Sequence, residues 1–177
     1  MKNEELRVIP KKNYIILGIV VLLTIGLVYY FYTWSKLYND VKLNERILDN
    51  YMEVINYNEL EDYLIENPDT VIYVSVLKNS TIRDFEKKFR KVLKNNEIDK
   101  KILYLDLTND IDNKNLKNEM KKKYHINNLD ITDVPLIMVI ENGTLKTIYS
   151  IRYNDYDSGL VKNFLNSIEF EEDEIDG

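Results

Sequence analysis

The chain has 177 residues, with 24 Lys and Arg against 30 Asp and Glu and a formal net charge of −6. This length suits one domain with room for an appendage and excludes a large multidomain enzyme. The chain has no Cys, which excludes a disulfide framework, a thiolate metal site and a cysteine nucleophile. It also has no Ala and no Gln but 14 Tyr and 21 Asn, a bias toward AT-rich codons that favours a low-GC bacterial source.

Residues 13–34 contain no Lys, Arg, Asp, Glu or His and are predicted to be a transmembrane signal anchor. A helix of about 21 residues rises about 31 Å, close to the hydrocarbon thickness of a bilayer. Tyr29, Tyr30, Tyr32 and Trp34 gather at one end as an interfacial aromatic belt. The first alternative, a buried core helix, would carry a polar face. The second, a cleaved signal peptide, would be shorter and would end in small residues.

The charges on either side of the anchor predict its orientation. Four basic residues lie in the short N-terminus, residues 1–12, and three follow the anchor closely. The positive-inside rule therefore places the N-terminus in the cytoplasm and the rest of the chain outside the membrane. Residues 1–12 carry a net charge of +2 and the remainder −8, and this acidic balance argues against non-specific binding to nucleic acid or anionic lipid.

Residues 35–50 are predicted to form a stalk helix. The seam residues alternate spacings of four and three over about two heptads: Leu37, Val41, Asn44, Leu48 and Tyr51. A coiled coil normally needs three or four heptads, roughly twice as many. A helix that packs on the neighbouring domain is therefore favoured over a dimerisation seam, and the oligomeric state stays open.

Residues 51–168 are predicted to form one α/β domain. Strands are expected at 52–56, 70–77, 102–107, 136–141 and 144–150, and helices at 58–66, about 79–95, 115–124 and 155–168. The second strand is apolar on both faces, which is typical of a central strand covered by helices. Asn142-Gly143 between the last two strands is a strong hairpin signal. This order predicts a mixed sheet with parallel crossovers first and an antiparallel pair last.

Two charged segments are expected to face solvent. The outer face of the helix at 79–95 carries a basic stripe, interrupted by Asp84 and Glu86: Arg83, Lys87, Arg90, Lys91 and Lys94. Because of the interruption, a solvated face is favoured over a phosphate-binding surface. Residues 169–177, which include four consecutive acidic residues, are predicted to be a disordered acidic tail.

No metal or cofactor is expected. His125 is the only imidazole and has no second ligand near it, so a position at a helix end is favoured over metal binding. Asp106, Asp110 and Asp112 are spaced like part of a calcium loop, but the Gly and the distal Glu of such a loop are missing. These three Asp residues are therefore interpreted as a polar loop.

Three local motifs resemble the thioredoxin-like fold. Val71-Ile-Tyr-Val-Ser-Val-Leu-Lys, followed by Asn79-Ser80-Thr81-Ile82, resembles the strand that runs into a Cys-x-x-Cys motif at a helix start. Lys121-Lys-Lys-Tyr-His-Ile126 resembles the lysine-rich helix end of that family. Asp133-Val134-Pro135, before a strand that ends at Asn142-Gly143, resembles its Val-Pro dipeptide with a cis-proline. The resemblance covers residues 51–168 and implies a thioredoxin-like mixed sheet flanked by helices, preceded here by one N-terminal transmembrane helix.

The resemblance places Asn79 and Ile82 at the two cysteine positions of the family, and Tyr73 where many members bury a carboxylate. Because a thiolate is the attacking species in disulfide exchange, thioredoxin-type redox catalysis is excluded. Ser80 and Thr81 have no base near them in sequence, so helix capping is favoured over nucleophilic catalysis. An enzyme like the glutathione transferases would need a further helical domain that this length does not supply. The chain is therefore not expected to be an enzyme.

The expected function is binding. The resemblance implies a groove beside a cis Val134–Pro135 bond that holds an extended peptide. The residues expected to line it are Asn79, Ser80, Thr81, Ile82, Thr132, Asp133, Val134 and Pro135. The prediction is a membrane-anchored, redox-inactive adaptor or chaperone-like module at the outer face of a bacterial membrane, with an unidentified protein or extended peptide as its partner. Two alternatives stay open: a structural subunit of an envelope or transport complex, and a degenerate thiol-disulfide oxidoreductase or bacteriocin-accessory relative.

Overall fold

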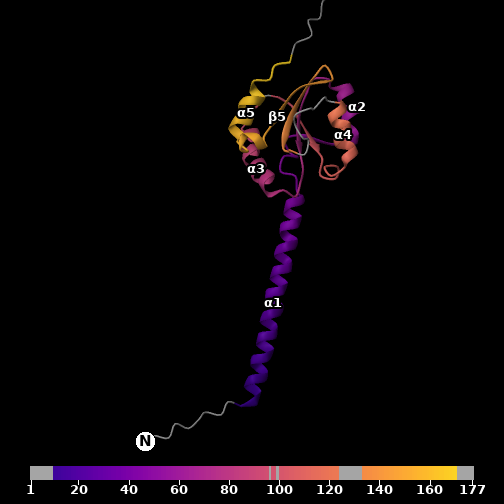
Figure 1. Ribbon diagram of the computed structural model, residues 1–177. Helices are drawn as coiled ribbons and strands as arrows, with labels where there is room; N and C mark the ends of the chain where they lie inside the picture. Colours follow the sequence, from indigo (N-terminus) through magenta and orange to yellow (C-terminus); the bar gives the residue numbers. More distant parts are fainter. Residues whose placement is uncertain (1–9, 96, 99, 124–132, 171–177) are drawn as a thin grey trace, which may run out of the picture. The chain divides into compact units, whose positions relative to one another are not determined.

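The computed structural model describes residues 10–95, 97–98, 100–123 and 133–170, and the chain divides into two compact units at residues 42 and 43 (Figure 1). The helix α1 (Lys11–Asn44) makes up nearly all of the described part of the first unit. Its last two residues, Leu43 and Asn44, belong to the second unit. None of the described side chains of α1 is buried. The helix is long and apolar enough to cross a membrane.

The two threonines inside the apolar stretch of α1 are satisfied within the helix. The hydroxyl groups of Thr24 and Thr33 donate to the carbonyl oxygens of Val20 and Tyr29, at 2.8 and 3.0 Å. A hydroxyl bonded to the carbonyl four residues earlier needs no water, so both threonines are compatible with a lipid environment.

The helix ends earlier than the predicted stalk. Of residues 35–50, those after Asn44 form bends and a turn instead of a helix. The reason is tertiary: Leu48 is fully buried in the domain, and its carbonyl oxygen accepts from the backbone N–H groups of Tyr51 and Met52. Burial of Leu48 outweighs the helical pattern, which by itself is a weak determinant.

The second unit contains one five-stranded sheet. Its strands are β1 (Glu53–Asn56), β2 (Thr70–Ser75), β3 (Ile102–Asp106), β4 (Leu136–Glu141) and β5 (Thr144–Ser150). The order across the sheet is β1-β3-β2-β4-β5, with β1, β3 and β2 parallel and the hairpin β4–β5 antiparallel to β2. The predicted mixed sheet is confirmed.

Helices cover both faces of the sheet. They are η1 (Tyr57–Glu59), α2 (Leu60–Glu66), α3 (Ser80–Lys94), α4 (Lys114–Lys123), η2 (Arg152–Asn154) and α5 (Ser158–Asn166). Figure 1 shows α2 and α4 on one side and α3 and α5 on the other. A hydrophobic core lies on each face of the sheet, and alternate residues of β2 are buried in the two cores. Ile72 and Val74 belong to one core, and Val71 and Tyr73 belong to the other. This division confirms β2 as a central strand.

Two turns explain where the last elements begin. Asn142 and Gly143 both have positive φ, at 50° and 70°, as the tight hairpin turn between β4 and β5 requires. The helix expected at 155–168 is shorter, because Asp155 and Tyr156 are left-handed, with φ of 52° and 54°. The side chain of Asp157 then caps α5 by accepting from the N–H groups of Gly159 and Leu160, at 2.7 and 3.1 Å.

Candidate functional site

Of the residues predicted to line a groove, those that the structure describes lie at one edge of the sheet. Val74 of β2 pairs with Leu136 of β4 in antiparallel register, so Pro135 lies beside the end of β2. Ser75 pairs with Asp106 in the parallel β2–β3 ladder, so β3 ends at the same level. The chain leaves β2 there and enters α3 at Ser80. We call this end of β2 and β3, together with the α3 start and Val134–Pro135, the carboxyl edge.

The start of α3 is capped by Asn79. Its side-chain oxygen accepts from the backbone N–H groups of Thr81 and Ile82, at 3.0 and 3.2 Å. These helix-start donors are therefore engaged within the chain. Asn79, Ser80 and Thr81 are exposed, whereas Ile82 is buried in the same core cluster as Val134.

The proline side of the edge forms a buried floor. The Val134–Pro135 bond is cis, as expected, and both residues are buried. The carbonyl oxygen of Pro135 accepts from the N–H of Ile151 at 3.2 Å, and Asp133 pairs with Arg152 at 2.9 Å. Two residues singled out in the sequence, Thr132 and His125, lie outside the described residues.

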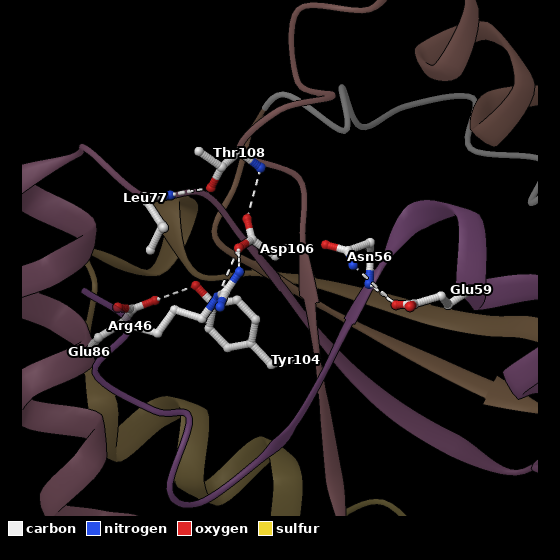
Figure 2. A network of polar contacts seen from close by, with 8 residues as sticks. All are labelled: Arg46, Asn56, Glu59, Leu77, Glu86, Tyr104, Asp106 and Thr108. Carbon is white, nitrogen blue, oxygen red and sulfur yellow. Dashed lines mark hydrogen bonds and ion pairs between the residues drawn. The ribbon is translucent and has the colours of Figure 1, made fainter. Parts of the chain in front are cut away.

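The other side of the edge holds an ion pair that the sequence did not reveal (Figure 2). Asp106 is not part of a polar loop, since it is the last residue of β3 and its side chain is only 5% exposed. The Nε and Nη2 atoms of Arg46 donate to its Oδ2 at 2.9 and 2.7 Å. The Oδ1 atom of Asp106 accepts from the N–H of Thr108. The hydroxyl of Thr108 in turn accepts from the N–H of Leu77. These bonds tie the ends of β2 and β3 together.

A second buried carboxylate lies behind the edge. Glu86 was predicted on the solvated face of its helix, but it is 3% exposed and faces the sheet. Its Oε1 accepts from the hydroxyl groups of Ser75, Tyr73 and Tyr104, at 3.0, 3.1 and 3.3 Å. Helix periodicity contained the signal, since Glu86 follows the buried Ile82 by one turn.

Burial controls the protonation of this group. Burial raises the pKa of Glu86 above its ordinary value, and the hydrogen bonds from Ser75, Tyr73 and Tyr104 oppose the shift. Burial and the neighbouring Glu86 also raise the pKa of both tyrosines, so their hydroxyls stay protonated and donate. Because the acceptor and donors are buried, the cluster organises the core and has no access to a substrate.

The carboxyl edge offers shape and hydrogen bonds but little chemistry. Asn79 and Ile82 stand at its helix start, and the chain contains no cysteine to take part in disulfide exchange. Among the described residues, no group of three His, Asp or Glu could hold a metal ion.

Comparison with known protein families and with curated proteins gives no match. Among solved structures, the chain is similar to the reduced thioredoxin pre-protein of Schistosoma mansoni, at 15% identity over 66% of this chain and 99% of that one, with a TM-score of 0.41. It is also similar to the J-Trx1 fragment of ERdj5, at 11% identity and a TM-score of 0.41. That match covers 67% of this chain and 52% of the fragment. A designed protein shares 16% identity over 67% of this chain and 95% of the other, with a TM-score of 0.38.

The fold is established by the chain's own topology. Its strands lie in the order β1-β3-β2-β4-β5, with parallel and antiparallel pairs, and helices cover both faces of the sheet. The cis Val134–Pro135 bond lies directly before β4. Thioredoxin-like proteins are among its structural neighbours. With no cysteine in the chain, this fold argues against thioredoxin-type redox catalysis.

Proposed function

We propose that the chain is a membrane-anchored protein-binding module. In this proposal α1 spans a bacterial cell membrane with the N-terminus in the cytoplasm, and the domain outside acts as an adaptor or chaperone. The excess of basic residues before the apolar stretch, four against three, supports this orientation. The partner is a protein that offers an extended segment to the carboxyl edge.

The observation that carries the proposal is the composition of this edge. Exposed polar residues, Asn79 to Thr81, stand beside a buried apolar floor of Ile82, Val134 and Pro135. Extended peptides bind such places through main-chain hydrogen bonds and side-chain pockets, which require no reactive group. The loss of the dithiol removes redox exchange and leaves a surface suited to recognition.

Site-specific photo-crosslinking in native membranes tests the proposal. A photoreactive residue at Ser80 is preferable to one at Asn79, because the side chain of Asn79 caps α3. The matched control is Lys94, which is exposed at the far end of the same helix. We expect a discrete crosslinked protein from Ser80 and none from Lys94. Equal capture from both positions would contradict binding at the carboxyl edge.

A structural subunit of an envelope or transport complex is the main alternative. It predicts capture from a photoreactive residue in α1, such as at Tyr38, and none from Ser80. Tyr38 is exposed and lies outside the domain, so a crosslink there would report contacts of the helix alone.

A further inference from the structure

The four residues Leu43 to Arg46, here called the strap, are held against the carboxyl edge by contacts from three places in the domain. The carbonyl oxygen of Leu43 accepts from the N–H of Lys78 at 3.1 Å. The carbonyl oxygen of Glu45 accepts from Nη1 of Arg83 at 2.8 Å. The guanidinium of Arg46 forms the ion pair with Asp106. The strap thus contacts the β2–α3 loop, the first turn of α3 and the end of β3.

The domain side of these contacts forms a defined recognition surface. We call Lys78, Arg83 and Asp106 the dock. It supplies a backbone N–H, a guanidinium and a carboxylate, which match two main-chain carbonyls and one arginine side chain. Both donor atoms of Arg46 meet a single oxygen of Asp106, at 2.9 and 2.7 Å. Charge-assisted hydrogen bonds of this kind are strong and selective for arginine.

The strap does not complete the dock. The Nε atom of Arg83 is buried and has no hydrogen-bond partner in the described part of the chain. The side chain of Arg83 is 13% exposed, and its Nη2 lies 3.9 Å from the carboxylate of Glu45. A buried N–H without an acceptor is costly, so a segment with an acceptor at this position would be bound in preference to the strap.

The strap is more exposed than the residues that follow it. Leu43 is half-buried, and Asn44, Glu45 and Arg46 are exposed. The following residues, Ile47 and Leu48, are buried in the domain core and would remain in place. Release of the strap would therefore leave the core closed, but it would also leave Asp106, whose side chain is 5% exposed, without its arginine partner. A buried carboxylate without a partner is costly, so an incoming arginine would have to take the place of Arg46.

We propose that the dock is a second binding site, for a segment that carries an arginine after two accessible main-chain carbonyls, and that the strap is an exchangeable internal ligand of this site. A partner segment competes with the tethered strap for the same donors and the same carboxylate. Its binding would free residues 43–46 to act as a linker. The dock lies on the β3 side of the α3 start and the predicted groove on its β4 side, so the two sites adjoin without sharing their principal residues.

Competition with a synthetic strap tests this proposal on the full chain in detergent micelles. The probe is a fluorescent peptide with the sequence of residues 42–49, Lys-Leu-Asn-Glu-Arg-Ile-Leu-Asp. In the Arg46→Ala chain the internal ligand is weakened while the dock is intact. We expect this chain to bind the peptide at least about tenfold more tightly than the wild type. The weakened strap lacks the arginine that pairs with Asp106, whereas the peptide keeps it and so competes better for the dock.

Matched variants assign the effect to the dock. Arg90→Ala removes an exposed arginine from α3 and should leave peptide binding at the wild-type level. Adding Asp106→Asn to Arg46→Ala removes the carboxylate of the dock and should abolish the gain. Arg46→Lys keeps a charge beside Asp106 in case Arg46→Ala does not fold, and it should bind the peptide more tightly than the wild type.

Three results would overturn the proposal. The first is no gain in either Arg46 variant, and the second is a gain that persists without Asp106. The third is a dimer by light scattering in which two chains exchange straps, because the ligand would then be a second copy. The assay contains no cellular partner and does not involve Val134–Pro135. Failure of the dock and failure of the proposed function are therefore separate results.

Discussion

Glu86 shows how one residue can set the pH dependence of the domain. Its carboxylate accepts three hydroxyl groups in a buried site, and burial raises its pKa above the ordinary value of 4.5. The folded chain therefore binds a proton more tightly at Glu86 than the unfolded chain does. Glu86 therefore contributes less to the free energy of unfolding as the pH rises from the ordinary pKa of a glutamate toward the raised pKa of Glu86.

The variant Glu86→Gln should remove this part of the pH dependence. Gln stays neutral and keeps an oxygen that can accept from Tyr73, Tyr104 or Ser75. The difference in unfolding free energy between Glu86→Gln and the wild type should shift in favour of Gln as the pH rises above about 4.5, then level off above the raised pKa. Thermal unfolding of both full chains across this pH range measures it.

The variant Glu86→Ala is the control for the hydrogen bonds. It leaves buried hydroxyls without an acceptor and should lower the unfolding free energy by about 1–3 kcal/mol at neutral pH. If the unfolding free energies of the wild type and of Glu86→Gln depended on pH in the same way, the pKa of Glu86 would not be raised by folding, which would contradict the prediction for Glu86→Gln.

Asn79 acts locally, through the start of α3. Replacing it with Ala removes the acceptor for two helix-start N–H groups and should cost about 1 kcal/mol of stability. Asn79→Asp retains the acceptor and should restore most of that loss. Because the side chain of Ser80 has no role in the cap, Ser80→Ala should change the melting temperature little. Equal losses in Asn79→Ala and Ser80→Ala would contradict the capping assignment.

At the scale of elements, the start of α3 tests the alignment with the thioredoxin-like fold. The chain with both Asn79→Cys and Ile82→Cys should form an internal disulfide on mild oxidation. Residues three apart at a helix start bring their Cα atoms within the roughly 4.4–6.8 Å that a disulfide spans. The chain contains no other cysteine, so titration should find two thiols before oxidation and none after.

Each single cysteine variant is the control, since neither can form the internal bond. A double variant that keeps both thiols under oxidising conditions would show that Asn79 and Ile82 do not occupy the two cysteine positions. The Ile82→Cys single variant and the double variant both lose packing at the buried Ile82, so comparing these two separates the disulfide from the packing loss.

Most elements were predictable because their signals are local. The apolar run of β2, the Asn142-Gly143 turn and the apolar face of α3 each specify their structure over a few neighbouring residues. The strap was not predictable, because the partners Arg46 and Asp106 are 60 residues apart in the chain. Glu86 was misplaced for a related reason: charge suggested solvent, while helix periodicity placed it over Tyr73 and Tyr104.

The candidate site was predictable only in part. The sequence brought the α3 start and Val134–Pro135 together through the resemblance, and the β2–β4 register agrees with it. Helix periodicity predicted Ile82 on the inner face of α3, and it is buried. The same reasoning did not reveal that Val134 and Pro135 are buried, since burial of a loop depends on how the surrounding elements pack. It also did not identify the dock, whose three residues come from separate segments.

At the scale of the whole molecule, the account depends on an apolar helix and a cysteine-free domain in one chain. The helix α1 is long and apolar enough to cross a membrane, and the domain has a mixed sheet covered by helices on both faces. The central claim is that this domain lies outside the cell membrane and is occupied by a partner at its carboxyl edge. Both parts of the claim can be tested with a single introduced thiol.

The decisive measurement is labelling of the Ser80→Cys and Lys94→Cys chains in intact cells with a membrane-impermeant maleimide. Both positions are exposed, and the chain has no other thiol. Each variant is compared with itself after purification in detergent, because a thiol at a helix start is more reactive than one elsewhere. We predict that Lys94→Cys labels at similar rates in cells and after purification, whereas Ser80→Cys labels several-fold more slowly in cells. Lys94→Cys that labels only after lysis, or Ser80→Cys with equal rates in both conditions, would contradict the account.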